Sequence, residues 1–149
     1  MIGPFLENPE KVLHPPFLDE QGRFVLAFRR KAAGKGWWWL GGRERPGELP
    51  EQSLTRILLR EIGFVPKDIR PLASFHHLWD ERGEVPADCG RHDLIQLFLA
   101  YVSEKIISRI RLDPEEYDAE KGLLRYDGTQ EVRTAVASSY RFFSTFAKR

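Results

Sequence analysis

The sequence predicts an α+β fold in which a mixed β-sheet is packed between helices, an α/β/α sandwich. Short apolar runs with the alternation of β-strands occur through most of the chain. Two segments with helical spacing of apolar residues, one central and one near the C-terminal end, can cover such a sheet. No internal repeat or low-complexity tract is visible. This order favours a mixed sheet over a doubly wound sheet or a helix bundle.

Length and composition set the outer limits. With 149 residues we expect one domain over residues 1–149, large enough to bury roughly two-thirds of its unfolded surface. The net charge of +1 provides no general attraction to nucleic acid or membranes, so we expect neither as a partner. The single Cys89 excludes an internal disulfide. We see no membrane-spanning stretch and no signal-peptide pattern, and expect a cytoplasmic protein.

The first elements form a predicted β-hairpin. Apolar runs from Val12 to Leu18 and from Arg23 to Arg30 are separated by the turn-rich tetrapeptide Asp19-Glu20-Gln21-Gly22. In the second run phenylalanine and leucine occupy alternate positions. Side chains of a strand alternate between faces, so Arg29 is expected to point away from the phenylalanines.

The central elements are a strand and a helix. Trp37 to Leu40 form a short strand that stops at Gly41-Gly42. The helix is expected to begin near Pro50, because proline is tolerated in a first helical turn. Gly63 provides the C-terminal stop. The apolar stripe of this helix consists of Leu54, Ile57, Leu58 and Ile62.

The second half of the chain adds three strands and a helix. Two strands, Leu72 to Trp79 and Leu94 to Val102, are joined by a loop from Asp80 to Arg91. A charged stretch, Ser103 to Lys121, precedes a short strand from Leu123 to Tyr126 and a helix from Gln130 to Ala147. The helix carries apolar residues on one face, namely Val132, Val136, Tyr140 and Phe143.

Residues Gly41 to Phe64 carry a motif in a strand–loop–helix context. The segment resembles the Nudix box at seven fixed offsets, occupied by Gly42, Glu48, Arg56, Leu58, Glu61, Gly63 and Phe64. Two positions that hold glutamate in the box hold Ile57 and Arg60 here. The resemblance implies a Nudix fold and hydrolysis of a nucleotide derivative.

The two departures change the metal chemistry that the resemblance implies. Positions 57, 60 and 61 share one helix face, where three glutamates would hold two or three divalent ions. Glu61 alone can hold one ion, since Mg²⁺ accepts one or two carboxylates together with phosphates and water. We therefore expect one Mg²⁺ ion, or Mn²⁺ in its place, and not multi-metal pyrophosphatase chemistry.

In lacking carboxylates of the box, the chain resembles one Nudix branch, the GDP-mannose mannosyl hydrolases. Further segments look like that branch, namely Gly22 to Leu26 with Arg29, Gly36 to Trp38, Phe75 to Trp79 and Ser139 to Phe142. The resemblance implies that water attacks the anomeric carbon of a nucleotide sugar and that the nucleoside diphosphate leaves. It also implies a homodimer.

The resemblance assigns roles by position. Glu61 and the Gly41 carbonyl would be metal ligands, while Arg29, Arg43 and Arg56 would contact or position the diphosphate. His14 stands where the branch has an aspartate. The late loop that carries a further ligand and the base in that branch corresponds to residues 113–118, where Glu115 or Glu116 would bind the ion and the other would activate water.

Each role has a plainer alternative. Glu48 and Arg56 can pair to fix the loop onto the helix, and Arg60 is expected to be a solvated surface charge. Residues 113–120 would ordinarily form a solvated acidic loop. Two further functions stay open: a Nudix hydrolase that cleaves the diphosphate of a nucleoside diphosphate derivative with replacement carboxylates such as Glu44, Glu115 and Glu116, and a catalytically silent Nudix fold that serves as a binding or regulatory module.

Overall fold

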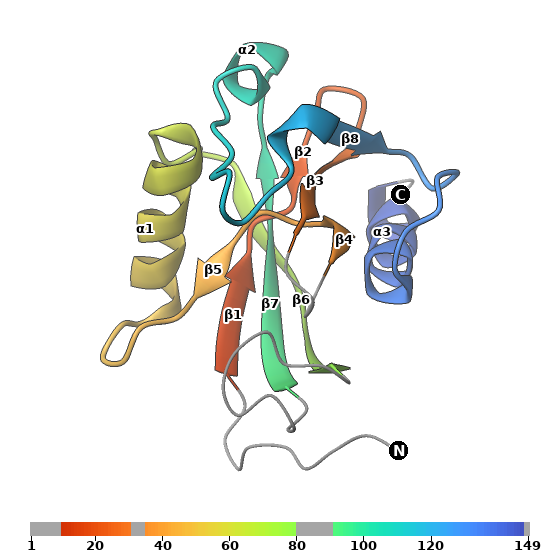
Figure 1. Cartoon of the computed structure of the whole chain (residues 1–149). Helices are drawn as coiled ribbons and strands as arrows, with labels where there is room; N and C mark the ends of the chain where they lie inside the picture. The colour runs from red at the N-terminus through yellow and green to blue at the C-terminus, as the bar shows by residue number, and fades with distance from the viewer. Residues whose placement is uncertain (1–9, 31–34, 80–90, 148–149) are drawn as a thin grey trace.

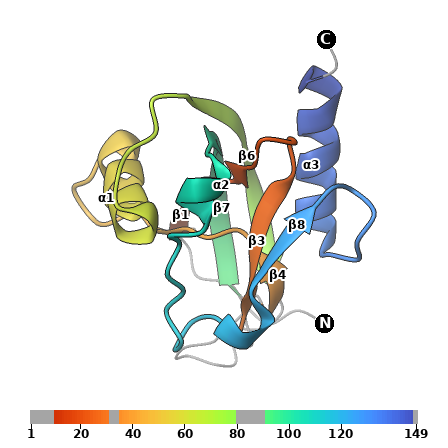
Figure 2. The same cartoon turned by 90° about the horizontal axis from the view of Figure 1, so that it is seen from above.

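The computed structural model describes residues 10–30, 35–79 and 91–147. A mixed eight-stranded sheet lies between helix α1 (Pro50–Ile62) and helix α3 (Thr134–Ala147), which cover opposite faces (Figure 1). The view from above separates the two helices in the same way (Figure 2). The predicted α+β sandwich is confirmed.

The sheet combines parallel and antiparallel pairs. Its order is β4-β3-β2-β7-β1-β5, with β6 paired to β7 and β8 paired to β3. Strand β7 is parallel to β1 and β2, and the other pairs are antiparallel. The strands are β1 (Glu10–His14), β2 (Phe17–Leu18), β3 (Phe24–Arg29), β4 (Gly36–Trp38), β5 (Gly42–Arg43), β6 (Ile69–Trp79), β7 (Arg91–Tyr101) and β8 (Leu123–Tyr126).

The first predicted strand is in fact two strands. Pro15 and Pro16 lack backbone N–H groups and cannot donate to a strand ladder, so Val12 to Leu18 is interrupted between β1 and β2. The predicted hairpin survives in shorter form, because β2 pairs with β3 across the turn at residues 19–22.

Alternation along β3 divides the core in two. Phe24 and Leu26 pack in the cluster that contains residues of α3, whereas Val25 and Ala27 pack in the cluster that contains residues of α1. Residues two apart share a face of a strand, so Arg29 belongs to the α1 side, as the sequence predicted. This placement brings it to the same side of the sheet as the Nudix-like motif.

Helix α1 has the predicted bounds and buried face. It begins at Pro50, and all four residues of its apolar stripe are buried. Gly63 ends it with a left-handed φ of +81° and donates its N–H to the Leu59 carbonyl. A side chain is strained at this φ, which explains the stop at glycine.

Other predicted bounds change in detail. Helix α3 begins at Thr134, not at Gln130, and β6 begins at Ile69. The charged stretch contains two short helices, α2 (Glu104–Ile107) and η1 (Ala119–Lys121). Residues 80–90 of the expected loop, with Cys89, lie outside the described residues. None of the helices in the described ranges is long and apolar enough to cross a membrane.

Candidate active site

Gly41 lies where the chain passes tightly against β1. A Cβ atom at this position would be 2.2 Å from His14 Nδ1 and 2.4 Å from the Leu13 carbonyl oxygen, distances that only glycine avoids. The buried His14 donates from Nδ1 to the Leu40 carbonyl at 3.2 Å and accepts from Trp38 Nε1 at 3.2 Å. This histidine therefore fixes the strand that leads into Gly41.

Arg60 connects both groups that were expected to bind a metal ion. Its Nη2 donates to the Gly41 carbonyl at 2.8 Å and to Glu61 Oε1 at 2.9 Å. Its Nε lies 3.3 Å from the same carboxylate oxygen. The Arg60 side chain is 50% exposed, as expected of a surface charge, but its guanidinium also bonds to Gly41 and Glu61.

The floor beneath Arg60 is apolar and closely packed. A Cβ atom on Gly42 would lie 3.2 Å from Arg60 Nη2 and 3.3 Å from Ile57 Cγ1. Ile57 is fully buried, as expected for a member of the helix stripe. Absence of a side chain at Gly42 thus leaves the space that the guanidinium fills.

Glu61 is a buried carboxylate in a charged environment. Its side chain is only 6% exposed. Burial raises the pKa of Glu61, and Arg60 offsets part of this effect by charge and hydrogen bonding. The negative charges of Glu116 and Asp113 raise the pKa further, which places both residues within electrostatic range of Glu61.

The acidic segment after α2, residues 113–120, is held against β3 by hydrogen bonds. Arg30 donates from its backbone N–H to the Glu116 carbonyl and from Nη1 to the Pro114 carbonyl, both at 3.0 Å. The Asp118 N–H donates to the Phe28 carbonyl at 2.9 Å. The hydrogen bonds to β3 bring the acidic segment to the site.

Arg29, from β3, and Glu116, from the acidic segment, form a charged pair. Arg29 Nη2 lies 3.8 Å from Glu116 Oε1. The Arg29 side chain is 14% exposed, and its buried Nε has no hydrogen-bond partner within the part of the chain that the structure describes. A buried donor without an acceptor is costly, and an anionic ligand at this guanidinium would compensate its charge.

Tyr117 is a buried phenol within electrostatic range of these charges. Burial together with the negative charges of Glu116 and Glu61 raises its pKa. Arg29 and Arg60 act on it in the opposite direction, so both guanidinium groups lie within electrostatic range of one side chain. The phenol is therefore a neutral group at neutral pH.

Glu48 and Arg56 form a separate pair that fixes the loop before α1. Arg56 Nε and Nη2 donate to the two carboxylate oxygens at 3.0 and 2.9 Å, and Nη2 also donates to the Arg43 carbonyl at 2.8 Å. Glu48 further accepts from Ser53 Oγ and from the Arg45 N–H, both at 2.9 Å. The pairing that was considered from sequence is confirmed, whereas a diphosphate contact by Arg56 stays a prediction.

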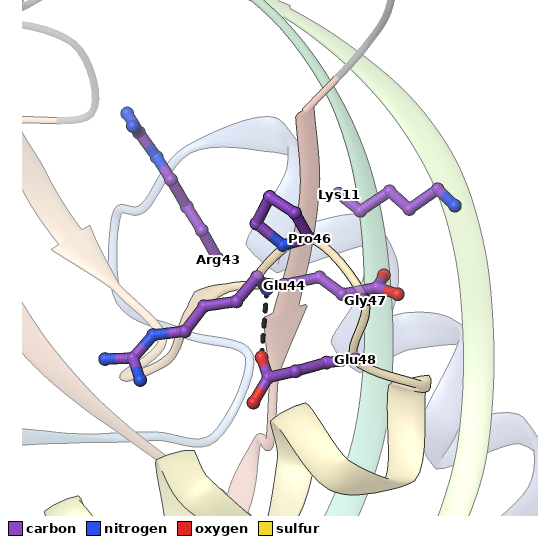
Figure 3. Close-up of a pocket in the computed structure, with 7 residues that line it drawn as sticks. Lys11, Arg43, Glu44, Pro46, Gly47 and Glu48 are labelled. Atoms are coloured by element: carbon purple, nitrogen blue, oxygen red, sulfur yellow. Dashed lines mark hydrogen bonds between the residues drawn. The ribbon is translucent and has the colours of Figure 1, made fainter.

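A hollow of about 470 Å³ lies beside this loop. Figure 3 shows Lys11 and Arg43 extending from it in opposite directions, and Glu48 bonded to the loop backbone. Glu44 Oε2 is buried there, and none of the described residues bonds to it. The hollow is lined by Lys11, Arg43, Glu44, Arg45, Pro46, Gly47 and Glu48. Glu61 and Arg60 are not among these lining residues, so the hollow is distinct from the cluster around Glu61.

The structure thus groups some predicted site residues and separates others. Gly41 and Glu61 bond to the same guanidinium, that of Arg60, and Arg29 lies 3.8 Å from Glu116, whose charge acts on Glu61. Glu115 is exposed on the acidic segment. Arg43 and Arg56 belong to the loop before α1.

Sequence reasoning did not assign site roles to Arg60, Asp113 and Tyr117. The spacing of Arg60 from Ile57 on one helix face was the available signal for the first. For Tyr117, the available signal was an aromatic ring within a run of acidic residues, since such a ring tends to be buried.

Comparisons with known proteins give the family. The NUDIX domain family matches residues 8–144, and the chain belongs to this family. It is 39% identical over 56 residues to an RNA pyrophosphohydrolase of Pectobacterium atrosepticum, a match that spans 38% of this chain and 30% of that relative.

Solved structures of low identity share the fold. A MutT protein from Methanosarcina mazei Go1 is 20% identical, with 97% of this chain and 99% of that chain covered and a TM-score of 0.65. An Ap4A hydrolase of C. elegans is 14% identical, with 93% and 98% covered and a TM-score of 0.63.

Nudix hydrolases generally use a divalent metal ion, typically Mg²⁺. The residues around Glu61 do not fit such an ion in their present arrangement. Both expected ligands, the Gly41 carbonyl and the Glu61 carboxylate, are already bonded to Arg60. Within residues 10–30, 35–79 and 91–147, no three Asp, Glu, His or Cys side chains come close enough to hold a metal ion.

Proposed function

We propose that the protein hydrolyses a nucleotide sugar, most like GDP-mannose, at the anomeric carbon of the sugar. In this reaction the oxygen of water bonds to the carbon, the bond from that carbon to the diphosphate oxygen breaks, and the nucleoside diphosphate leaves. The proton of water passes to a carboxylate. Free sugar and nucleoside diphosphate are the products.

The observation that carries this proposal is the pair of guanidinium groups around Tyr117. Among the described residues no acceptor bonds to the buried Nε of Arg29, and Arg60 is half exposed and bonded to Glu61. Guanidinium groups bind phosphate oxygens with charge-assisted hydrogen bonds. Fixed positive charge stabilises a departing diphosphate as its negative charge develops.

The shortage of carboxylates supports attack at carbon over attack at phosphorus. Metal-assisted attack at phosphorus uses ions that stabilise both the attacking and the leaving oxygens, and those ions need several carboxylates. Ile57 and Arg60 remove two of them from the box. Attack at carbon needs charge stabilisation only at the leaving group.

Glu116 is the carboxylate that we assign to water activation. It lies near both Arg29 and Glu61, while Glu115 is exposed on the same segment. A positioned carboxylate can take the proton of an attacking water as general base. Arg43 and Arg56 would position the diphosphate from the loop before α1.

A second function, hydrolysis at phosphorus in a nucleoside diphosphate derivative, is favoured by one observation. The relative from Pectobacterium atrosepticum is an RNA pyrophosphohydrolase, and it matches this chain over 56 residues. Such chemistry would require replacement carboxylates. Glu44, whose buried Oε2 bonds to no residue that the structure describes, lines the hollow beside the loop.

Incubation with a panel of nucleotide sugars, a dinucleoside polyphosphate and 5′-triphosphorylated RNA, with products identified by mass, tests the proposal. We expect free sugar and nucleoside diphosphate. Sugar phosphate with nucleoside monophosphate would instead support the second function. If no compound gives a product, the remaining function is that of a catalytically silent binding module. The panel is run with Mg²⁺, with Mn²⁺ and with EDTA.

The homodimer that the branch implies belongs to this proposal. Light scattering during size-exclusion chromatography should give twice the 17.3 kDa of one chain. A mass of one chain would contradict a dimer and leave the assignment of Arg29 and Glu116 unaffected.

A further inference from the structure

Arg60 bonds to both groups that a metal ion would be expected to bind in this fold. We propose that its guanidinium is the resident cation of the site, in the place where Nudix hydrolases generally hold a divalent ion, and that it binds the diphosphate of the substrate directly. The first half depends only on the geometry of Arg60, Gly41 and Glu61. The second half rests on the proposed function.

The position of the guanidinium is determined by its surroundings. Nη2 lies between two acceptors, at 2.8 Å from the Gly41 carbonyl and 2.9 Å from Glu61 Oε1. It also lies 3.2 Å from the point that a Cβ on Gly42 would occupy. Glycine at position 42 and a backbone carbonyl at position 41 therefore leave a space of suitable size for this group.

Charge explains why the arrangement disfavours a metal ion. The buried carboxylate of Glu61 needs a positive partner, and Arg60 provides one at hydrogen-bonding distance. An added divalent ion would have to displace bonds to both ligands and would then lie close to a guanidinium that stays protonated. Both effects weaken metal binding.

The guanidinium keeps one side available to a ligand. Nη2 and Nε bond to the protein, whereas Nη1 has no partner among the described residues, and the side chain is half exposed. A metal ion in such a site would likewise bind protein on one side and phosphate on the other. Arginine does this with the planar donor geometry that matches phosphate oxygens.

Titration with Mn²⁺, followed by the electron paramagnetic resonance of the free ion, tests the first half. We expect wild type and Glu61→Gln to bind the same amount of Mn²⁺, because Glu61 does not contribute to metal binding while Arg60 is present. Arg60→Glu should gain one Mn²⁺ ion that the double variant Arg60→Glu/Glu61→Gln loses. Arg60→Gln, which removes the charge without adding a ligand, should bind less tightly than Arg60→Glu.

The opposite result is equally clear. One Mn²⁺ ion bound by wild type and lost in Glu61→Gln would overturn the proposal, even if Arg60→Glu did not fold. This comparison needs no catalytic activity, so it remains informative if the proposed function is wrong.

Binding of GDP in EDTA, measured by calorimetry, tests the second half. Wild type should bind GDP without metal, and Arg60→Gln should weaken binding about tenfold or more, the effect of one charge-assisted hydrogen bond. Arg70→Gln is the control, since Arg70 is an exposed residue paired with Asp68. Binding that requires Mg²⁺ and vanishes in EDTA would overturn this half. No GDP binding under any condition would overturn both this half and the proposed function, while the Mn²⁺ result would stand.

Discussion

Arg29 and Glu116 face each other with Nη2 and Oε1 3.8 Å apart, too far for a direct hydrogen bond. Strand β3 supplies the arginine and the acidic segment supplies the glutamate, and backbone hydrogen bonds from Arg30 and Asp118 hold the two pieces together. The charge of Glu116 acts on both Glu61 and Tyr117 and raises the pKa of each. This relationship leads to the first two predictions.

Replacement of Arg29 should impair substrate binding more than folding. Arg29→Gln removes a charge that would contact the diphosphate, and a hydrogen bond to a charged group contributes about 1.5–3 kcal/mol. We expect kcat/KM for a nucleotide sugar to fall by roughly tenfold to a hundredfold. Steady-state kinetics measure it, with Arg70→Gln as an exposed control. Equal kcat/KM values for wild type and Arg29→Gln would contradict a role of this arginine in substrate binding.

The two neighbouring glutamates should behave differently. Glu116→Gln removes the assigned general base, and such bases typically contribute about 10²–10⁴-fold to rate. We expect kcat to fall within that range, and Glu115→Gln to stay near wild type, because Glu115 is exposed. Kinetics of the two variants in parallel measure the difference. A large loss of kcat in Glu115→Gln, with Glu116→Gln near wild type, would show that Glu115 is the general base.

The Glu48–Arg56 pair predicts a pH dependence of stability. Hydrogen bonding from Arg56, opposed by burial and aided by the Arg45 N–H and Ser53, lowers the pKa of Glu48 from 4.5 to about 2. A lowered pKa in the folded state means that the stabilisation is present above pH 4.5 and is lost as pH falls through about 2. Wild type should therefore be more stable than Glu48→Gln at pH 6, with the difference closing between pH 4.5 and 2.

Thermal melts at several pH values measure this effect. The exposed Glu51→Gln variant in the first turn of α1 is a control for general loss of negative charge. A constant difference between wild type and Glu48→Gln across this pH range would contradict the account of the pair.

Gly41 and Gly42 should differ in their tolerance of alanine. At position 41 a Cβ would lie 2.4 Å from a backbone carbonyl and 2.2 Å from a buried histidine ring, so the backbone must shift. At position 42 its nearest contacts are side-chain atoms at 3.2–3.4 Å. Overpacking typically costs about 1–3 kcal/mol, and we expect Gly41→Ala to reach or exceed the upper value and Gly42→Ala the lower.

Denaturant unfolding compares the two glycine variants directly. Gly42→Ala should also disturb Arg60, whose Nη2 is its nearest neighbour, and so weaken nucleotide binding in a folded protein. Equal stability of Gly41→Ala and wild type would show that β1 does not pack against this position as described.

Local patterns in the sequence were enough for much of the fold. The bounds of α1 followed from Pro50 and Gly63, and the alternation along β3 placed Arg29 on the correct face. Predictions failed where pairing between distant segments decides the outcome. The pairing of both β1 and β2 with β7 is of this kind. The split between β1 and β2, in contrast, had a local signal in Pro15 and Pro16 that the prediction did not use.

The site was harder to predict because its central contacts depend on three-dimensional packing. The box spacing identified Gly41 and Glu61, and the pairing of Glu48 with Arg56 was recognised as an alternative. The orientation of Arg60 toward Gly41 could not be read from spacing, since it depends on the space above Gly42 and Ile57. Proximity of Glu116 to Glu61 depends likewise on hydrogen bonds between the acidic segment and β3.

Hydrolysis of a nucleotide sugar in ¹⁸O-labelled water tests the central claim most directly, because it identifies the atom that water attacks. Attack at carbon predicts that mass spectrometry finds the label in the hydroxyl group of the released sugar and none in the nucleoside diphosphate. Label in a phosphate group of either product would mean attack at phosphorus and would contradict the account of the site around Arg29, Arg60 and Glu116.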